Sequence, residues 1–226
     1  MKTVFVDVDT QIDFLFPAGA LYVAGAERLL PAIARLNQFA AGQGLPLIST
    51  ADAHSENDAE FKQWPPHCVA GTTGQTKPGE TLLSNRITLG FGRGPMELAQ
   101  IPAQIIVEKQ FLDVFSNPNF PALLDRLQAD SYVVYGVATD YCVRCAITGL
   151  LATGFAAILG IQVFVIVGGV VGLVPLTGIT LPFVSYGGSS MVANIVMIGL
   201  LRLFSVHAQD ENQRAGVGGS TAKSNV

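Results

Sequence analysis

Short apolar runs alternate with stretches of helical periodicity along the first two-thirds of the chain. The run Thr3–Val8 is β-branched and apolar and ends at an acidic residue, as a buried parallel strand does. In Glu27–Ala41 the apolar residues recur at helical spacing, and Gly42 and Gly44 follow as a stop signal. The same reasoning predicts further strands and helices at Leu45–Thr50, Gln104–Glu108, Ala122–Gln128, Tyr132–Val137 and 141–153. Alternation of this kind predicts an α/β fold, a three-layer parallel sheet with helices on both faces.

The pattern changes near Phe155. Two apolar runs, Phe155–Val174 and Met191–Phe204, flank a loop with scattered polar residues, and no charged residue or histidine occurs between Arg144 and Arg202. Since about 20 apolar residues suffice to span a bilayer, this stretch favours a membrane-type helical hairpin at 155–206. The alternative is that Ile161–Val167 supplies a fifth strand of the sheet. The polar tail 207–226 is expected to be disordered, and 1–154 is expected to form the first domain.

Composition narrows the functional classes. A net charge of −4 gives no reason to expect nucleic acid as a partner. The N-terminus has no signal-peptide pattern, because acidic residues follow Met1 within a few positions, so the first domain is expected in the cytoplasm. Three cysteines, Cys68, Cys142 and Cys145, then indicate free thiols.

Reactive side chains follow the predicted strands. Asp9, Asp52, Lys109 and the turn 138–142 each come directly after an apolar run, and the carboxyl ends of parallel strands carry active groups in such folds. The long polar segment Ala51–Thr81 lies between two of them, and loops of that length are usually functional.

Four strings together resemble the nicotinamidase-type cysteine hydrolases of the isochorismatase-like superfamily: V-D-T-Q-I-D-F at 8–14, A-D-A-H with W-P-P-H-C-V at 51–69, V-E-K-Q at 107–110 and G-V-A-T-D-Y-C-V-R at 136–144. The resemblance covers residues 1 to about 154. It implies an amidohydrolase that converts nicotinamide, or a related small amide, to the acid and ammonia through a thioester. Cys142 would be the nucleophile, Asp9 the proton acceptor and Lys109 the neighbouring cation. The oxyanion would be bound by the N–H groups of Ala138 and Cys142, with a cis peptide at Val137–Ala138.

Elementary electrostatics agrees with these roles. A helix N-terminus and an ammonium group both lower a thiol pKa, so Cys142 is expected to form a thiolate readily. The Cys142-x-x-Cys145 spacing also fits a redox pair, but it lacks a thioredoxin-like context, so Cys145 is interpreted as a buried helix residue.

The same resemblance implies a divalent metal, with zinc the first choice and manganese or iron as alternatives. Its ligands would be Asp52, His54 and His67, with Glu60 completing the set ahead of Glu56 and Asp58. In the family this metal anchors the pyridine nitrogen of the substrate, and the aromatics Phe14, Trp64 and Tyr141 match positions that wall its ring.

A second resemblance covers the remainder. The string P-L-T-G-I-T-L-P-F-V-S-Y-G-G-S-S at 175–190 resembles the last two membrane helices of the SEDS family, the FtsW and RodA type glycosyltransferases. That family's catalytic region is missing here, so glycosyltransferase activity is not implied. The chain is therefore predicted to be a cysteine hydrolase tethered to the inner membrane through 155–206, with homo-oligomers allowed. The alternatives are a truncated hydrolase without activity that is fused to a membrane anchor, or a SEDS-family membrane fragment without activity.

Overall fold

The computed structural model describes residues 2–92, 98–154, 195–203 and 206. Its contacts separate into two compact units that divide between Ala146 and Ile147, and each unit is described by itself below.

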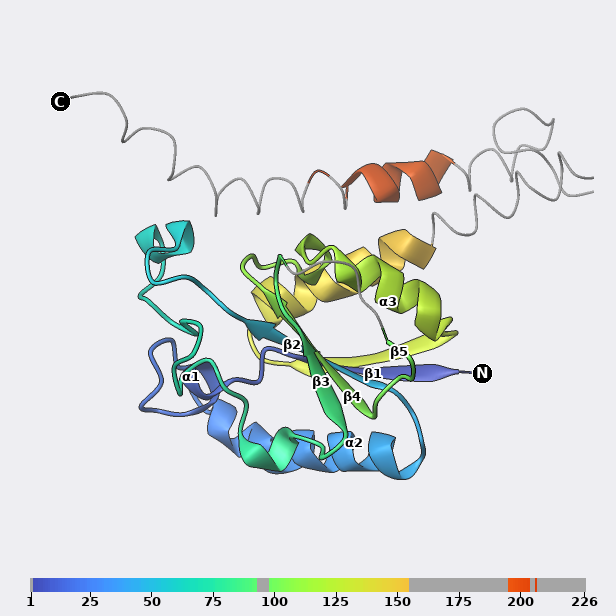
Figure 1. Ribbon diagram of the computed structural model, residues 1–226. Coiled ribbons are helices and arrows are strands. Elements are labelled where there is room, and N and C mark those ends of the chain that lie inside the picture. Colours follow the sequence, from blue (N-terminus) through green and yellow to red (C-terminus); the bar gives the residue numbers. More distant parts are fainter. Residues whose placement is uncertain (1, 93–97, 155–194, 204–205, 207–226) are drawn as a thin grey trace, which may run out of the picture. The chain divides into compact units, whose positions relative to one another are not determined.

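The first unit contains a five-stranded sheet in the order β3-β4-β2-β1-β5, and all its neighbouring strands are parallel (Figure 1). The strands are β1 (Thr3–Val8), β2 (Leu47–Asp52), β3 (Arg86–Leu89), β4 (Gln104–Lys109) and β5 (Ser131–Gly136). Four of the five match predicted strands to within two residues at each end. The order places β1 and β2 at the centre, where their side chains are almost all buried.

The strand β3 was missed by the sequence analysis. It has only four residues and alternates exposed and half-buried positions, because it is the outer strand beside β4. An edge strand needs no continuous apolar run, so the pattern that revealed the central strands is absent from it.

Helices cover both faces of the sheet, as predicted. In Figure 1, α2 (Leu30–Gly42) lies on one face and α3 (Asn119–Leu127) on the other. Helix α2 turns Ile33, Asn37 and Ala40 inward. It ends in a Schellman motif, in which Leu45 N–H donates to Ala40 O and Gly44, at φ 64°, supplies the left-handed residue. A short α1 (Ile12–Leu15) follows β1, and 3-10 turns occupy Ala26–Leu29, Ala59–Lys62, Gly79–Thr81 and Val114–Ser116.

Within the described residues, β5 is the other edge of the sheet. It pairs with β1 alone, and its residues are half-buried or exposed whereas those of β1 are buried. Val133 is 38% exposed. The proposed fifth strand, Ile161–Val167, lies outside the described residues, so its pairing with β5 stays a hypothesis.

The described residues of the second unit are helical at 147–154 and 195–203. In the latter segment Ile195, Val196, Ile198 and Leu203 are exposed. A search of the described helices finds none that combines the length and apolarity of a bilayer span. Most of the predicted hairpin 155–206 and all of the tail 207–226 lie outside the described residues.

Candidate functional site

The register of the sheet gathers the reactive side chains at one edge. Asp52 of β2 is paired directly with Lys109 of β4, and Val8, the residue before Asp9, is paired with both Thr50 and Gly136. Three parallel strands and the segment after β5 therefore end at the same level, which is where the sequence predicted the site.

Asp9, Lys109 and Cys142 form a buried cluster of three groups in direct contact. The Lys109 Nζ lies 3.0 Å from Asp9 Oδ2 and 3.5 Å from Cys142 Sγ, and the thiol and the Asp9 carboxylate lie within 4.8 Å of each other. All three side chains are at least 96% buried. The structure thus brings together the three side chains that the sequence predicts to be the nucleophile, the proton acceptor and the neighbouring cation.

The charges of this cluster set the resting protonation states. Burial raises the pKa of Asp9, but the Lys109 ammonium and the hydrogen bond from Thr50 outweigh it, so the net pKa of Asp9 is lowered. Burial also works against the charge on Lys109, but the carboxylates of Asp52 and Asp9 hold its pKa well above the usual value. The carboxylate and the ammonium are therefore both charged before substrate binds.

The expected ready ionisation of Cys142 is not what the structure gives. Burial raises the pKa of the thiol well above its usual value, and the opposing ammonium of Lys109 does not compensate, because Asp9 and Asp52 add negative charge nearby. The resting group is therefore an uncharged thiol beside the Asp9 carboxylate. Proton transfer to Asp9 must therefore accompany attack on the substrate.

The turn that carries Cys142 is held in an unusual backbone conformation. Gly136 has φ 150°, and a Cβ there would lie 2.1 Å from Val8 O. Ala138 is in the left-handed region at φ 58°, and a single turn of π-helix, Thr139–Val143, leads into a helix at 144–154. The expected cis peptide at Val137–Ala138 is wrong: this bond is trans, and the left-handed Ala138 turns the chain instead.

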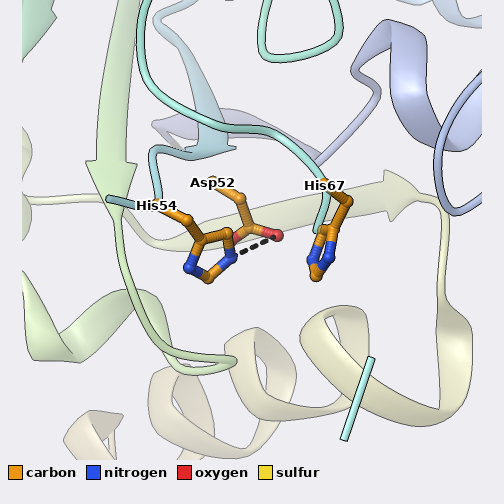
Figure 2. A group of neighbouring side chains, drawn as sticks. All are labelled: Asp52, His54 and His67. Carbon is orange, nitrogen blue, oxygen red and sulfur yellow. Dashed lines mark ion pairs between the residues drawn. The ribbon is translucent and has the colours of Figure 1, made fainter. Parts of the chain in front are cut away.

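Asp52, His54 and His67 place one ligand atom each within 4.8 Å of one another, and all three are buried (Figure 2). The His54 Nε2 is 4.0 Å from Asp52 Oδ2, too far for a hydrogen bond. Two ligands at about 2.0–2.2 Å from one tetrahedral ion are about 3.3–3.6 Å apart, so both atoms could bind the same ion after an inward shift of a few tenths of an ångström. Glu60 reaches one member of this group, with Oε1 3.9 Å from His67 Nε2.

The rings of His54 and His67 are held by contacts on their Nδ1 side. His67 Nδ1 donates to Pro65 O at 2.8 Å, and His54 Nδ1 faces Asp58 Oδ2 at 3.1 Å. The His67 ring therefore carries its proton on Nδ1 and has the Nε2 lone pair free to bind a cation, as metal-bound histidines do. This places Asp58 behind His54 rather than among the ligands, and Glu56 is exposed.

Unsatisfied polar atoms support the same interpretation. Glu60 Oε2 and both ring nitrogens of His54 are buried without a hydrogen-bond partner among the described residues. Burial raises the pKa of Glu60 to about 7, a sign that this carboxylate lacks a compensating charge. A divalent cation would satisfy these atoms, so Asp52, His54, His67 and Glu60 fit a metal.

A second group with metal-ligand chemistry, Asp9, Asp52 and Cys142, has a different explanation. The Lys109 ammonium contacts all three side chains, including a very short contact with Asp52 Oδ1. The positive charge that these groups need is already supplied by the chain itself.

A pocket of about 480 Å³ opens onto Cys142 and the candidate ligands Asp52, Glu60 and His67. The three aromatics predicted to bind substrate all line it. Trp64 and Tyr141 meet edge to face with centroids 5.4 Å apart, and Phe14 packs against His67 at 5.5 Å. Their contact with a substrate remains a prediction.

Several supporting residues were not identified from the sequence. Thr50 Oγ1 donates to Asp9 Oδ1 at 2.6 Å, and Gln11 holds Asp52 by accepting from its N–H and donating to its carbonyl. Asp13 accepts from the N–H of Cys68 and from that of Ala20, which ties the His67 loop to the pocket wall. The position of Thr50 at a predicted strand end was a usable signal, but the pairings of Gln11 and Asp13 depend on loop geometry.

Comparison with known protein families divides the chain in two. The isochorismatase domain matches residues 3–80, and the cell cycle protein family of FtsW, RodA and SpoVE matches residues 132–210. The second match begins within the sheet of the first unit, before the join predicted near Gly154.

Solved structures resemble the first unit. An isochorismatase-like hydrolase from Alkaliphilus metalliredigens is 26% identical with a TM-score of 0.55, over 68% of this chain and 76% of that one. A pyrazinamidase of Pyrococcus horikoshii, solved in complex with zinc, is 25% identical with a TM-score of 0.52, over 66% of this chain and 79% of that one.

Curated relatives resemble the other end. The peptidoglycan glycosyltransferase RodA of Mycobacterium leprae is 46% identical over 77 residues, 34% of this chain and 17% of that protein. A probable peptidoglycan glycosyltransferase FtsW of Bacillus subtilis is 47% identical over 66 residues, 29% of this chain and 16% of that protein. The chain thus spans about a sixth of the length of the curated relatives it matches. It combines an isochorismatase-like α/β fold, similar to nicotinamidases and pyrazinamidases, with a C-terminal segment that is similar to part of the FtsW and RodA proteins.

Proposed function

We propose that the first unit is an amidohydrolase of the nicotinamidase type, which converts nicotinamide or a related small amide to the acid and ammonia. The observation that carries this proposal is the buried contact among Asp9, Lys109 and Cys142, with Cys142 lining a pocket. The pyrazinamidase and isochorismatase-like relatives support it.

The chemistry follows from the resting charges. Asp9 takes the thiol proton as Cys142 Sγ attacks the amide carbon. The Lys109 ammonium stabilises the negative charge that develops on the attacking sulfur. The carbonyl oxygen gains charge near the backbone of Ala138 and Cys142, which both line the pocket. Asp9 then gives its proton to the departing ammonia, which leaves a thioester on Cys142. Water, activated by Asp9, hydrolyses the thioester and releases the acid.

The proposed metal site adjoins this reaction. Asp52, His54, His67 and Glu60 would hold a divalent cation, most simply zinc, which when bound would offer a Lewis-acid partner to the pyridine nitrogen of the substrate. The chain's own residues do the remaining positioning: Gln11 fixes Asp52, while Pro65 O and Asp58 fix the two rings.

Ammonia release from nicotinamide by the purified chain, with and without added zinc or manganese, tests the activity. The expected result is turnover that depends on metal. Absence of ammonia with every metal and amide tried would contradict the proposal.

The metal itself gives a separate prediction. His54→Ala should lose most of the bound metal, because it removes a ligand whose ring is already oriented by Asp58, and loss of such groups typically costs 10–100-fold or more in affinity. Glu60→Gln should weaken binding, while Glu56→Gln, at an exposed position in the same loop, should not. Elemental analysis after dialysis measures this, and an unchanged metal content in His54→Ala would show that the site is not a metal centre.

A second function is favoured by the match to FtsW and RodA over 132–210 and by the charge-free stretch up to Arg202. We propose that 155–206 attaches the hydrolase to the inner membrane. The exposed apolar residues at 195–203 support this.

Membrane attachment predicts that the full chain pellets with membranes and resists an alkaline wash. Val165→Arg, which places a charge inside the longest apolar run, should release a large fraction, since a charge at mid-membrane costs about 2.5–3.5 kcal/mol on insertion scales. If the unmodified chain stays in the supernatant without detergent, residues after Phe155 do not act as an anchor.

A further inference from the structure

The pocket has two chemically different ends. One is polar and holds Cys142 with Asp52, Glu60 and His67. The rest of the wall is largely apolar and comes from the segment after α1 and from the loop after β4, through Leu21, Val23, Ala24, Leu29 and Leu112. A ligand with its amide at Cys142 must lay its far side on these apolar side chains.

The charges of the wall disfavour an anionic ligand. The lining residues include the carboxylates of Asp52, Glu60 and Asp140, and none of those described is a lysine or arginine. A divalent cation at the metal site would balance only Asp52 and Glu60. A carboxylate on the far side of the substrate would add negative charge to a wall whose lining residues include acidic but no basic side chains.

The size and exposure of the far end indicate that it accommodates more than a bare ring. The volume of about 480 Å³ falls in the range of roughly 300–1,000 Å³ that holds drug-sized ligands. Val23, Leu29 and Tyr141 line the pocket and yet are 37%, 45% and 42% exposed. An apolar substituent on the substrate would cover these side chains, which otherwise face water.

We propose that this pocket selects uncharged primary aromatic amides that carry an apolar ring substituent, with the amide at Cys142 and the substituent against Val23, Leu29 and Leu112. The inference rests on the proposed amidase function, which requires only that the amide reach Cys142. The inference adds a preference for an apolar group on the side of the substrate ring that lies opposite the amide.

The single tryptophan of the chain makes the preference measurable without turnover. Trp64 is the chain's one tryptophan and lines the pocket, so its fluorescence reports occupancy. We would titrate the full-length Cys142→Ala variant, loaded with zinc, with nicotinamide, 5-propylnicotinamide and 5-(2-carboxyethyl)nicotinamide. The last two have similar size and differ in charge. The propyl compound should bind at least about tenfold more tightly than nicotinamide, and the carboxyethyl compound at least about tenfold more weakly than the propyl compound.

A matched pair of variants locates the effect. In the same background Val23→Ser should remove most of the propyl advantage, measured as the ratio of the affinities for the propyl compound and for nicotinamide. Val133→Ser changes an equally exposed valine, 38% against 37%, that lies on β5 outside the pocket lining, and it should preserve the advantage.

The outcomes separate the two proposals. Equal affinity for nicotinamide and its propyl derivative, or tightest binding of the carboxyethyl compound, would overturn the inference. If the unmodified chain also releases ammonia from nicotinamide, the amidase proposal survives that result. The expected order of affinities without any ammonia release would support the selectivity of the pocket and count against the amidase.

Discussion

Replacing Cys142 by alanine is expected to lower amide hydrolysis by about 10⁴-fold or more, because the attacking atom is removed and groups that act as a unit fail together. Cys145→Ala should retain turnover within a few-fold. Cys145 lies three residues along the same helix and is equally buried, so it is a control for cysteine loss in the same surroundings. Ammonia release under saturating nicotinamide, with metal added, measures both variants.

A covalent readout strengthens this prediction. Acid quenching during turnover should trap an acyl group on Cys142, visible by peptide mass spectrometry, and Asp9→Asn should slow its formation because the proton acceptor is lost. If the Cys145 variant is the inactive one, or if the acyl group maps to another residue, the nucleophile has been assigned wrongly.

The convergence of the site was predictable because parallel strands place their carboxyl ends together. Asp9, Asp52 and Lys109 follow apolar runs, so their meeting required only the correct fold class. The candidate ligands His54 and His67 were identified from loop motifs that resemble those of nicotinamidases. In the structure the centroids of their two rings lie 4.9 Å apart.

Other features of the structure depend on contacts between residues far apart in the sequence, which the local pattern of residues does not predict. The raised pKa of Cys142 results from complete burial beside Asp9 and Asp52, which a helix-start argument does not weigh. The trans peptide before Ala138 was missed because the cis form was carried over from a family resemblance. The edge strand β3 was missed because it has no apolar run that periodicity could detect. The ion pair between Lys77 and Asp7 joins residues 70 apart and could not be anticipated from either position.

The ion pair between Lys77 and Asp7 lies next to the turn that carries Asp9. The Lys77 Nζ is 3.2 Å from Asp7 Oδ2 and 2.9 Å from Thr10 Oγ1, and Thr10 in turn donates to Asp7 Oδ1 at 2.7 Å. Asp7 and Thr10 lie on either side of Asp9 in the chain, and the backbone of Asp9 has φ 51°. Lys77 is 6% exposed and Asp7 is fully buried.

Lys77→Met is therefore expected to reduce the free energy of unfolding by about 3–5 kcal/mol, because it leaves the buried carboxylate of Asp7 without its cation. The loss should fall toward the lower end of that range, since Thr10 and Ser49 still donate to Asp7. Such a loss is a large part of the roughly 5–15 kcal/mol of a typical domain. Urea unfolding of the first unit within the full chain, followed by Trp64 fluorescence, measures it.

Two further variants separate the ion pair from a general effect of losing a lysine. Lys62→Met, at an exposed position, should change stability by no more than about 0.5 kcal/mol. Lys77→Met combined with Asp7→Asn should cost less than the sum of the two single substitutions, because neither then leaves an uncompensated buried charge. Additive losses in the double variant, or a Lys77→Met chain as stable as Lys62→Met, would show that the pair does not brace the turn that carries Asp9.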